Sequence, residues 1–141
     1  MQITNLRKSR EILNLTQIEV AKLMDVDNST VSGWETGKDT IPIEQLIKYA
    51  NTFKYNLDYL FGLSKTNNYL TEYKINLYKI GLKLKITREK NSFSLEKVAD
   101  KLNTTKSTIW AYENNKNLIN TSFLFALTKI YKHFSIDELF N

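Results

Sequence analysis

Apolar residues recur along the chain at intervals of three and four positions, in short stretches that polar and turn-forming residues separate. This spacing is typical of amphipathic helices rather than of strands, so we expect an all-α fold. In the first half the pattern predicts five helices, the last of which begins at Asn56 and ends at Gly62. The other four are expected at about residues 3–13, at residues 17–24, from about residue 28 to the middle thirties, and at about residues 43–53.

The hydrophobic pattern and its punctuation repeat after 78 residues. The stretch "TVSGWETGK" at residues 30–38 returns as "TIWAYENNK" at residues 108–116, and an ungapped shift also matches Val20 to Val98 and Ala21 to Ala99. The offset slips by one only where "LDYLFG" meets "IDELFN". Because an internal repeat indicates a repeated structural unit, we expect two tandem five-helix domains. Their predicted limits are residues 1–64 and 79–141, joined by a linker at residues 65–78 that is helical from about residue 69.

Capping residues separate the second and third helices of each copy. Thr16 and Glu19 have the spacing of a capping box, whereas Ser94 and Lys97 provide only half of one. Asp25 and its counterpart Asn103 stand at the turn that follows, where a positive φ is expected and where Asp and Asn are tolerated best after Gly. Asp27 and Thr105 are the expected caps of the third helices.

The predicted linker carries an apolar seam with alternating spacings of three and four, which resembles a short coiled coil. One interpretation is a helix that packs within the chain and continues into the second copy, with Gly81 as a kink. The other is a dimer seam between two chains. The seam spans barely two heptads, which favours packing within the chain and leaves dimerisation open. Its members are Leu70, Tyr73, Leu77, Ile80 and Leu84.

Composition narrows the function classes. The chain has no Cys and one His, His133, so disulfides, thiolate metal sites and the usual zinc or iron ligand sets are excluded. No carboxylate pairs with a plausible base, and neither an enzyme nor a cofactor is expected. The amino terminus lacks the apolar stretch of a secretion signal, and no uncharged run is long enough to span a bilayer. We therefore expect a cytoplasmic protein without a membrane partner.

Charge is divided unevenly along the chain. Residues 1–64 hold 7 Lys/Arg and 8 Asp/Glu, a balance of −1, whereas residues 65–141 hold 13 and 7, a balance of +6. A basic surface fits a polyanion such as nucleic acid but does not by itself specify the partner.

The motifs resemble those of the phage repressor and Cro (XRE-type) helix-turn-helix family. The likeness in residues 6–62 rests on the "TQ…VA" opening, on "STVSGWETGK" and on the terminal "LDYLFG". Residues 84–140 look like a diverged member, with "SLEKVADKL", "KSTIWAYENNK" and "IDELF". In this copy Leu95 replaces the usual Gln and Asn115 the usual Gly. The resemblance implies a five-helix fold and binding to double-stranded DNA in the major groove.

A helix that reads base edges needs short polar residues on its outward face, so that its axis can approach the groove. Asn28 can make a two-point contact with adenine, and Gln17, at the start of the second helix, is placed to hold a phosphate. In the second copy Lys106 could serve a guanine or a phosphate, whereas Trp110 could pack on a thymine methyl, cover the domain's own surface, or bind another protein. The candidate DNA-binding residues are Gln17, Asp27, Asn28, Ser29, Ser32, Gly33, Lys38 and Thr40 in the first copy and Thr105, Lys106, Ser107, Trp110 and Lys116 in the second.

Two charged pairs have a structural interpretation instead. Arg10 and Glu35 are 25 residues apart, as are Arg88 and Glu113, and both pairs fall on parts of the predicted bundle that should touch. We expect each to be an ion pair between the first helix and the end of the third.

These observations predict a sequence-specific transcriptional regulator, and more specifically a repressor of phage or mobile-element type, with two DNA readers in one chain. No self-cleaving protease module is present, so release from DNA would need an antirepressor or other partner protein, dilution or proteolysis. The alternative is that the first copy binds DNA while the second serves homodimerisation or partner binding.

Overall fold

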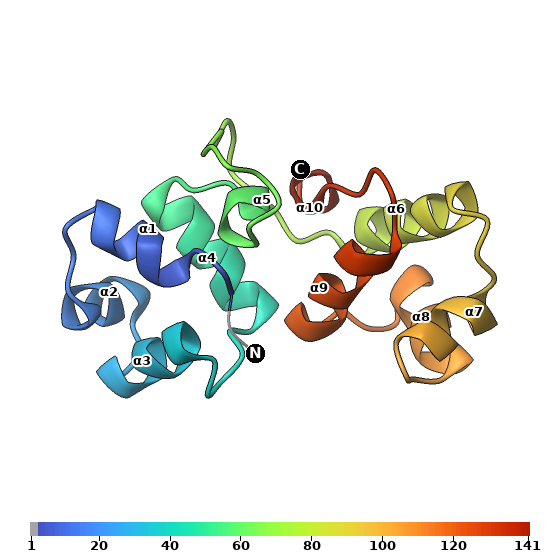
Figure 1. Cartoon of the computed structure of the whole chain (residues 1–141), viewed down its shortest axis with the longest axis horizontal. Helices are drawn as coiled ribbons and strands as arrows, with labels where there is room; N and C mark the ends of the chain where they lie inside the picture. The colour runs from blue at the N-terminus through green and yellow to red at the C-terminus, as the bar shows by residue number, and fades with distance from the viewer. Residues whose placement is uncertain (1–2) are drawn as a thin grey trace. The chain divides into compact units, whose positions relative to one another are not determined.

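The computed structural model describes residues 3–141, and this part of the chain is all-helical, with ten helices and no strand. The chain divides into two compact units between Tyr73 and Lys74 (Figure 1). Residues 1 and 2 of the predicted first domain lie outside the described residues. The first unit contains α1 (Leu6–Ile12), α2 (Gln17–Met24), α3 (Asn28–Thr36), α4 (Ile43–Phe53) and α5 (Leu57–Leu60). The second contains α6 (Leu77–Lys90), α7 (Leu95–Lys101), α8 (Lys106–Glu113), α9 (Thr121–Ile130) and α10 (Ile136–Leu139).

Each unit buries one stripe of every helix around its own core. In the first unit α4 contributes most, and the hydroxyl of its Tyr49 lies 2.7 Å from Oγ of Ser9 on α1. Burial raises the pKa of Tyr49 to about 12. In the second unit Leu124 of α9 and Ile136 of α10 are fully enclosed. The expected fold class, two tandem five-helix domains, is confirmed.

The turn between α2 and α3 is built as the sequence predicts. Glu19 N donates to Thr16 Oγ1 at 3.1 Å and Thr16 N to Glu19 Oε1 at 2.9 Å, which completes the capping box. In the second copy Ser94 accepts from Lys97 N at 3.0 Å. Both α2 and α7 are therefore capped at their N-terminal ends.

The turn residues differ in one respect from expectation. Asp25 and Asn103 have φ values of 57° and 54°, as expected, and Thr105 caps α8 by accepting from Thr108 N at 3.2 Å. Asp27, however, stands at the N-cap position of α3 without a side-chain cap hydrogen bond. The Thr30 N–H that it would satisfy donates instead to the backbone carbonyl of Asp27 at 3.0 Å. The carboxylate of Asp27 therefore stays on the surface.

The helix after the first unit begins at Leu77, not at about residue 69. Asn51 of α4 holds the backbone of Tyr73 from both sides, accepting from its N–H at 2.9 Å and donating to its carbonyl at 3.1 Å. These bonds take the backbone groups that a helix would use, and they attach residues up to Tyr73 to the first unit. Leu70 is 87% exposed and belongs to no seam. Asn76 then caps α6 by accepting from Lys79 N at 3.0 Å.

Gly81 does not kink α6, which runs unbroken from Leu77 to Lys90. Instead it lets α8 approach closely: a Cβ at this position would lie 2.6 Å from the carbonyl oxygen of Glu113. The missing side chain thus serves packing between α6 and the end of α8.

Candidate nucleic-acid interface

A buried ion pair holds α3 to α1. Arg10 donates from Nε to Glu35 Oε2 at 2.6 Å and from Nη2 to Glu35 Oε1 at 2.9 Å, and its Nη1 donates to the carbonyl of Leu15 at 2.9 Å. The hydrogen bond with Glu35 raises the pKa of Arg10, which stays charged. Because the guanidinium bridges α1, the α1–α2 loop and α3, it fixes the angle at which α3 leaves the turn.

The second unit repeats this arrangement. Arg88 donates to Glu113 from Nε at 2.7 Å and from Nη2 at 3.0 Å, and its Nη1 donates to the carbonyl of Phe93 at 2.9 Å. The hydrogen bond with Glu113 raises the pKa of Arg88 as well. Both predicted ion pairs are thus present, one at the end of α3 and one at the end of α8.

The position before the ion pair differs between the units. In the first, the Gln17 amide donates to Glu35 Oε1 at 3.1 Å, so Gln17 is bound to the ion pair and half-buried. Its NH₂ group has a second hydrogen that a phosphate oxygen can accept. Leu95 occupies the matching position and offers no donor. Sequence spacing placed Gln17 near DNA but gave no sign of its bond to Glu35.

The outward face of α3 is short and polar, as a groove-reading helix requires. Asn28 and Ser29 are exposed and Ser32 is half-buried, while Val31 points into the core. Gly33, predicted on the outward face, is buried: a Cβ there would lie 2.4 Å from Asp39 Oδ2, so this position packs against the loop after α3. Gly33 is therefore removed from the candidate surface.

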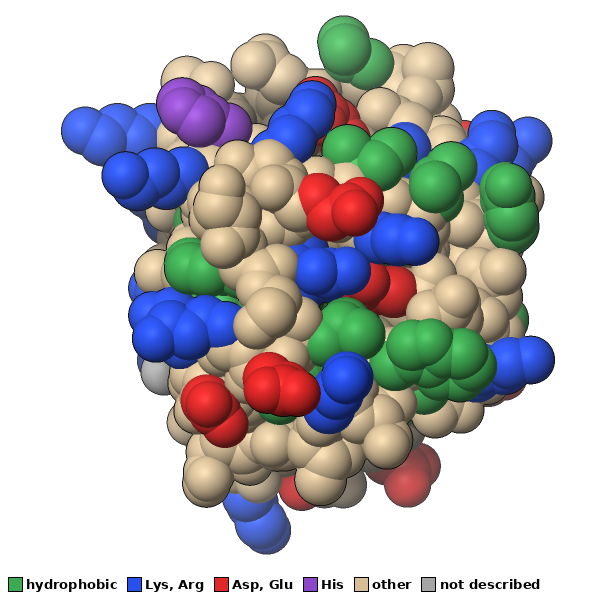
Figure 2. Space-filling model, turned by 90° about the vertical axis from the view of Figure 1, so that its right-hand side faces the viewer, with side chains coloured by type: hydrophobic (Ala, Val, Ile, Leu, Met, Phe, Trp, Pro, Cys, Tyr) green, Lys and Arg blue, Asp and Glu red, His purple; other side chains and the backbone are tan. Residues whose placement is uncertain are grey.

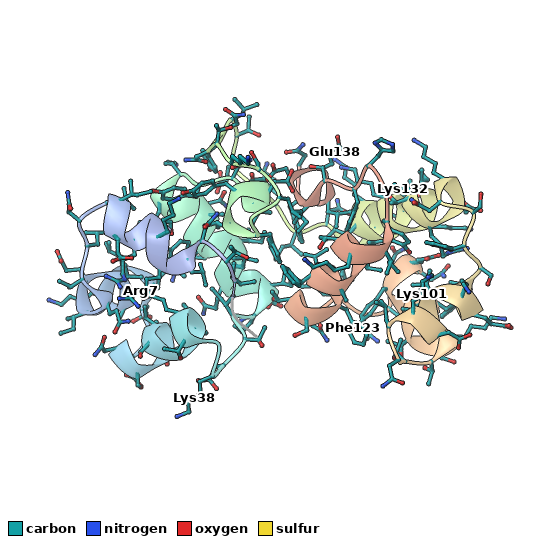
Figure 3. All side chains as sticks on the ribbon, viewed as in Figure 1. Arg7, Lys38, Lys101, Phe123, Lys132 and Glu138 are labelled. Carbon is teal, nitrogen blue, oxygen red and sulfur yellow. The ribbon has the colours of Figure 1, made fainter. Side chains whose placement is uncertain are left out.

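Beyond α3 the chain continues along the same side. Lys38 is exposed, and Figure 3 shows its side chain directed away from the ribbon in the loop that follows the helix. Thr40 is half-buried. Of the two, Lys38 is the better placed to reach a phosphate.

Exposed carboxylates surround α3, and sequence reasoning missed their significance. Asp25, Asp27 and Asp39 are all exposed. Their counterparts 78 residues later are Asn103, Thr105 and Asn117, none of which is charged. Charge counted over whole halves of the chain hid this difference, whereas counting position by position along the two motifs reveals it.

The surface of α8 is basic and carries one large aromatic side chain. Lys106 and Ser107 are exposed, and Trp110 is 46% exposed where the first copy has Ser32. Lys106 lies 3.7 Å from Glu96, but both side chains are mostly in solvent, so this pair is weak. The Thr105 hydroxyl serves mainly as the cap of α8.

Two further lysines extend this basic surface. Lys116 is exposed in the loop after α8. Lys101, at the end of α7, is exposed as well, and its Nζ lies 5.4 Å from the centroid of the Phe93 ring. Figure 2 shows a face of the second unit on which Lys and Arg side chains are spread among hydrophobic and acidic ones. We call Lys101, Lys106 and Lys116 the α8 lysines.

Two helices joined by a tight turn, the second presenting an exposed face, define a helix-turn-helix unit, and the chain contains two. The helix-turn-helix family model matches residues 6–60 and again residues 84–139, so the chain belongs to this family of DNA-binding transcription regulators, in its XRE-type form. No curated protein and no solved structure gives a significant match to the chain.

Membrane spans and metal clusters are both missing from the part of the chain that the structure describes. Within residues 3–141 no helix is both long and apolar enough to cross a membrane. The same residues contain no group of three or more His, Cys, Asp or Glu side chains that could hold a metal ion.

Proposed function

We propose that the chain is a transcriptional repressor that binds double-stranded DNA with both units and divides the work between them. The first unit reads base edges through Asn28, Ser29 and Ser32. The second supplies most of the attraction to phosphates through the α8 lysines. Covering a DNA site in this way would block transcription by occupancy and would need no catalytic group.

The single observation that carries the proposal is the difference between the two exposed helix faces. The face of α3 combines a bidentate donor and acceptor, Asn28, with short hydroxyl side chains, which suits direct reading. Its neighbours Asp25, Asp27 and Asp39 repel phosphates and lower affinity for DNA of any sequence. A protein with α3 alone would therefore bind weakly, and binding is expected to depend on the basic second unit.

The other candidate, in which the second unit serves assembly or a protein partner, is favoured by Trp110. A Trp that is 46% exposed is unusual unless it contacts something, and Trp is enriched where proteins bind one another. The surrounding lysines fit DNA better than they fit the centre of a protein interface, where Lys is depleted. For this reason we place DNA first.

Selection of duplexes from a random library with the intact chain, at near-physiological salt, tests the proposal. A selected sequence with one well-defined element flanked by a protected but variable stretch supports the division of work. Two well-defined elements would show that α8 also reads bases. A single element with no protection beside it would assign the second unit to assembly.

The setting of this regulator is also part of the proposal. Its likeness to phage repressors supports an origin in a phage or mobile element and action in the cytoplasm. We assign its release from DNA to a partner protein, to dilution or to proteolysis. Extract from host cells can be added to the immobilised protein in complex with its selected duplex. Release of the duplex would reveal such a partner.

A further inference from the structure

The second unit contains a cavity that the DNA-binding surface does not use. It has a volume of about 740 Å³ and lies between the second half of α6, the α9–α10 loop and α10. This volume falls within the range of about 300–1,000 Å³ that is usual for small-molecule sites. None of the exposed residues of α8 lines it. We call it the α6–α10 pocket.

Comparison with the first unit explains why the pocket is open. There, Tyr55 and Tyr59 stack with ring centroids 5.5 Å apart, and the Tyr55 hydroxyl donates to the carbonyl of Ser9 at 3.2 Å. At the matching positions the second unit has Phe134, which cannot make that hydrogen bond, and Glu138, whose side chain is exposed. The second unit therefore has an exposed carboxylate where the first has a buried tyrosine ring, and it lacks the stacked pair of rings found there.

The frame around the pocket is kept although its filling is lost. In the first unit Asn5 donates to the carbonyl of Tyr59 at 2.7 Å, and in the second Lys83 donates to the matching carbonyl, that of Glu138. Asn91 adds a link between α6 and the α9–α10 loop, because its Oδ1 accepts from Lys132 N at 2.8 Å. The pocket is therefore bounded by hydrogen-bonded elements.

The lining has the composition of a binding site for an organic anion. Apolar side chains of Ile86, Phe93 and Phe134 give it a hydrophobic wall. Lys90 and Lys132 add positive charge and are exposed, so that they can turn toward a ligand; Figure 3 labels Lys132 and Glu138, which lie along the same edge of the second unit. With Lys83 the lining has three lysine side chains and one acidic side chain, that of Glu138.

We propose that the α6–α10 pocket binds a small organic anion, in which a carboxylate, sulfonate or phosphate group is attached to a ring or an apolar chain. The anionic group would pair with Lys90 and Lys132, and the apolar body would lie against Phe93 and Phe134. A purely inorganic anion would leave the hydrophobic wall without a partner and would bind less well.

A ligand here has a short route to the recognition helix. The carbonyl of Phe93, a lining residue, accepts from Arg88, which in turn holds Glu113 at the end of α8. Occupancy that shifts Phe93 would shift Arg88 and, with it, α8. This regulatory consequence rests on the proposed DNA-binding function, whereas the ligand site itself does not.

The test uses 8-anilinonaphthalene-1-sulfonate, an anion with an aromatic body whose fluorescence rises on binding to apolar surface. The intact chain should bind one molecule saturably. The double variant Lys90→Gln/Lys132→Gln should weaken binding by about tenfold or more, the usual effect of losing a charge-assisted hydrogen bond. The matched control, Lys79→Gln/Lys97→Gln, removes the same charge from exposed positions of the same unit that do not line the pocket, and should change affinity less than about twofold.

Three results would overturn the ligand site: no saturable binding, several molecules bound per chain, or equal weakening in both double variants. All four lysines are exposed, so none of these substitutions threatens folding. Glu138→Gln, which removes the only acidic side chain of the lining at nearly constant volume, gives an independent check because it should tighten binding of the anionic probe. Unchanged affinity in a folded Glu138→Gln variant would count against the site.

The regulatory consequence has its own readout. The probe should change the affinity of the chain for its selected duplex, and this change should disappear in Lys90→Gln/Lys132→Gln. Probe binding without any change in DNA affinity would overturn the regulatory role and leave the site intact. Failure to bind any duplex would instead overturn the proposed function and would not affect the ligand site.

Discussion

The two units keep the same buried ion pair almost bond for bond and differ at several of the exposed positions around it. Arg10 and Arg88 each make two hydrogen bonds to a glutamate and a third to a loop carbonyl, with lengths that agree within 0.1 Å. Around α3, by contrast, stand Asp25, Asp27 and Asp39, where the second unit has the uncharged Asn103, Thr105 and Asn117. The buried ion pair orients the exposed helix of each unit, whereas the exposed side chains of that helix determine what it binds.

The two units also differ in what surrounds the same helices. Where Tyr59 stacks on Tyr55 in the first unit, Glu138 lines a pocket in the second. Where Gln17 adds a partner to Glu35, Leu95 leaves Glu113 with Arg88 as its side-chain hydrogen-bond partner. The second copy is therefore more dependent on its arginine and more open to ligands than the first.

The largest expected effect comes from breaking the ion pair in the second unit. Arg88→Ala should lower the free energy of unfolding by about 3–5 kcal/mol, because it leaves the buried carboxylate of Glu113 uncompensated. Arg10→Ala should cost less, since Gln17 still donates to Glu35. Hydrogen exchange resolved by peptide measures each unit separately in the intact chain. Equal losses of protection in the two variants would show that Gln17 contributes nothing to the clamp.

Removing the adenine contact should have the next largest effect. Asn28→Ala is expected to weaken binding to the selected duplex by about 1–3 kcal/mol while leaving binding to random DNA nearly unchanged. Fluorescence anisotropy with both duplexes measures the two affinities. Lys106→Ala, at the matching position of α8, is the paired variant and should weaken both equally. A loss of specificity in Lys106→Ala alone would reverse the roles assigned to the two units.

The α8 lysines should control the salt dependence. Replacing all three by Gln should make the slope of log affinity against log salt shallower by about 2.7, at about 0.9 for each phosphate that a lysine no longer neutralises. The reverse experiment copies the second unit onto the first through Asp25→Asn, Asp27→Thr and Asp39→Asn, and should raise affinity for random DNA. If the triple lysine variant leaves the slope unchanged, the α8 lysines do not neutralise phosphates, and the proposed contact of α8 with DNA is wrong.

A smaller difference is expected between the two caps. Thr16→Ala breaks a complete capping box and should cost about 1 kcal/mol or somewhat more, whereas Ser94→Ala breaks half of one and should cost less. Thermal unfolding followed by circular dichroism, with each variant compared with the parent chain, gives the values. The ranking would be wrong if Ser94→Ala were the more destabilising.

The smallest effect is a pH dependence confined to the first unit. Backbone and side-chain hydrogen bonds with Thr16 lower the pKa of Glu19 below its ordinary value of 4.5. Its stabilising contribution is thus complete above that value and is lost as the pH falls through the lower pKa of the folded state. Hydrogen exchange at the start of α2 should therefore quicken, relative to neighbouring helices, as the pH is lowered below 4.5 in the parent chain, and not in Glu19→Gln.

Much of this fold could be predicted from local signals in the sequence. Periodicity, capping residues and the 78-residue repeat predict the helices of both units. The 25-residue separation of Arg10 and Glu35 predicts their ion pair. Such features depend on residues close in sequence or on a known pattern of helix contacts. The adenine-reading role of Asn28 is a prediction that the structure leaves for experiment.

The features that were missed depend on tertiary hydrogen bonds and packing. The apolar spacing around Tyr73 favours a helix. Asn51, however, forms hydrogen bonds with the backbone N–H and carbonyl of Tyr73, and α6 begins only at Leu77. Gly33 was assigned to the outward face because it is small, yet the loop carrying Asp39 covers it. No periodicity encodes these contacts, because each joins a side chain or loop to a backbone that only the folded unit brings near.

One consequence of the tandem repeat concerns symmetry. A repressor made of two identical subunits presents the same residues twice, so its DNA site tends to be a palindrome. Here the two units are covalently joined and carry different side chains on α3 and α8. The site proposed for a single chain is accordingly expected to be directional, so that inverting it relative to a promoter would exchange which unit faces the polymerase.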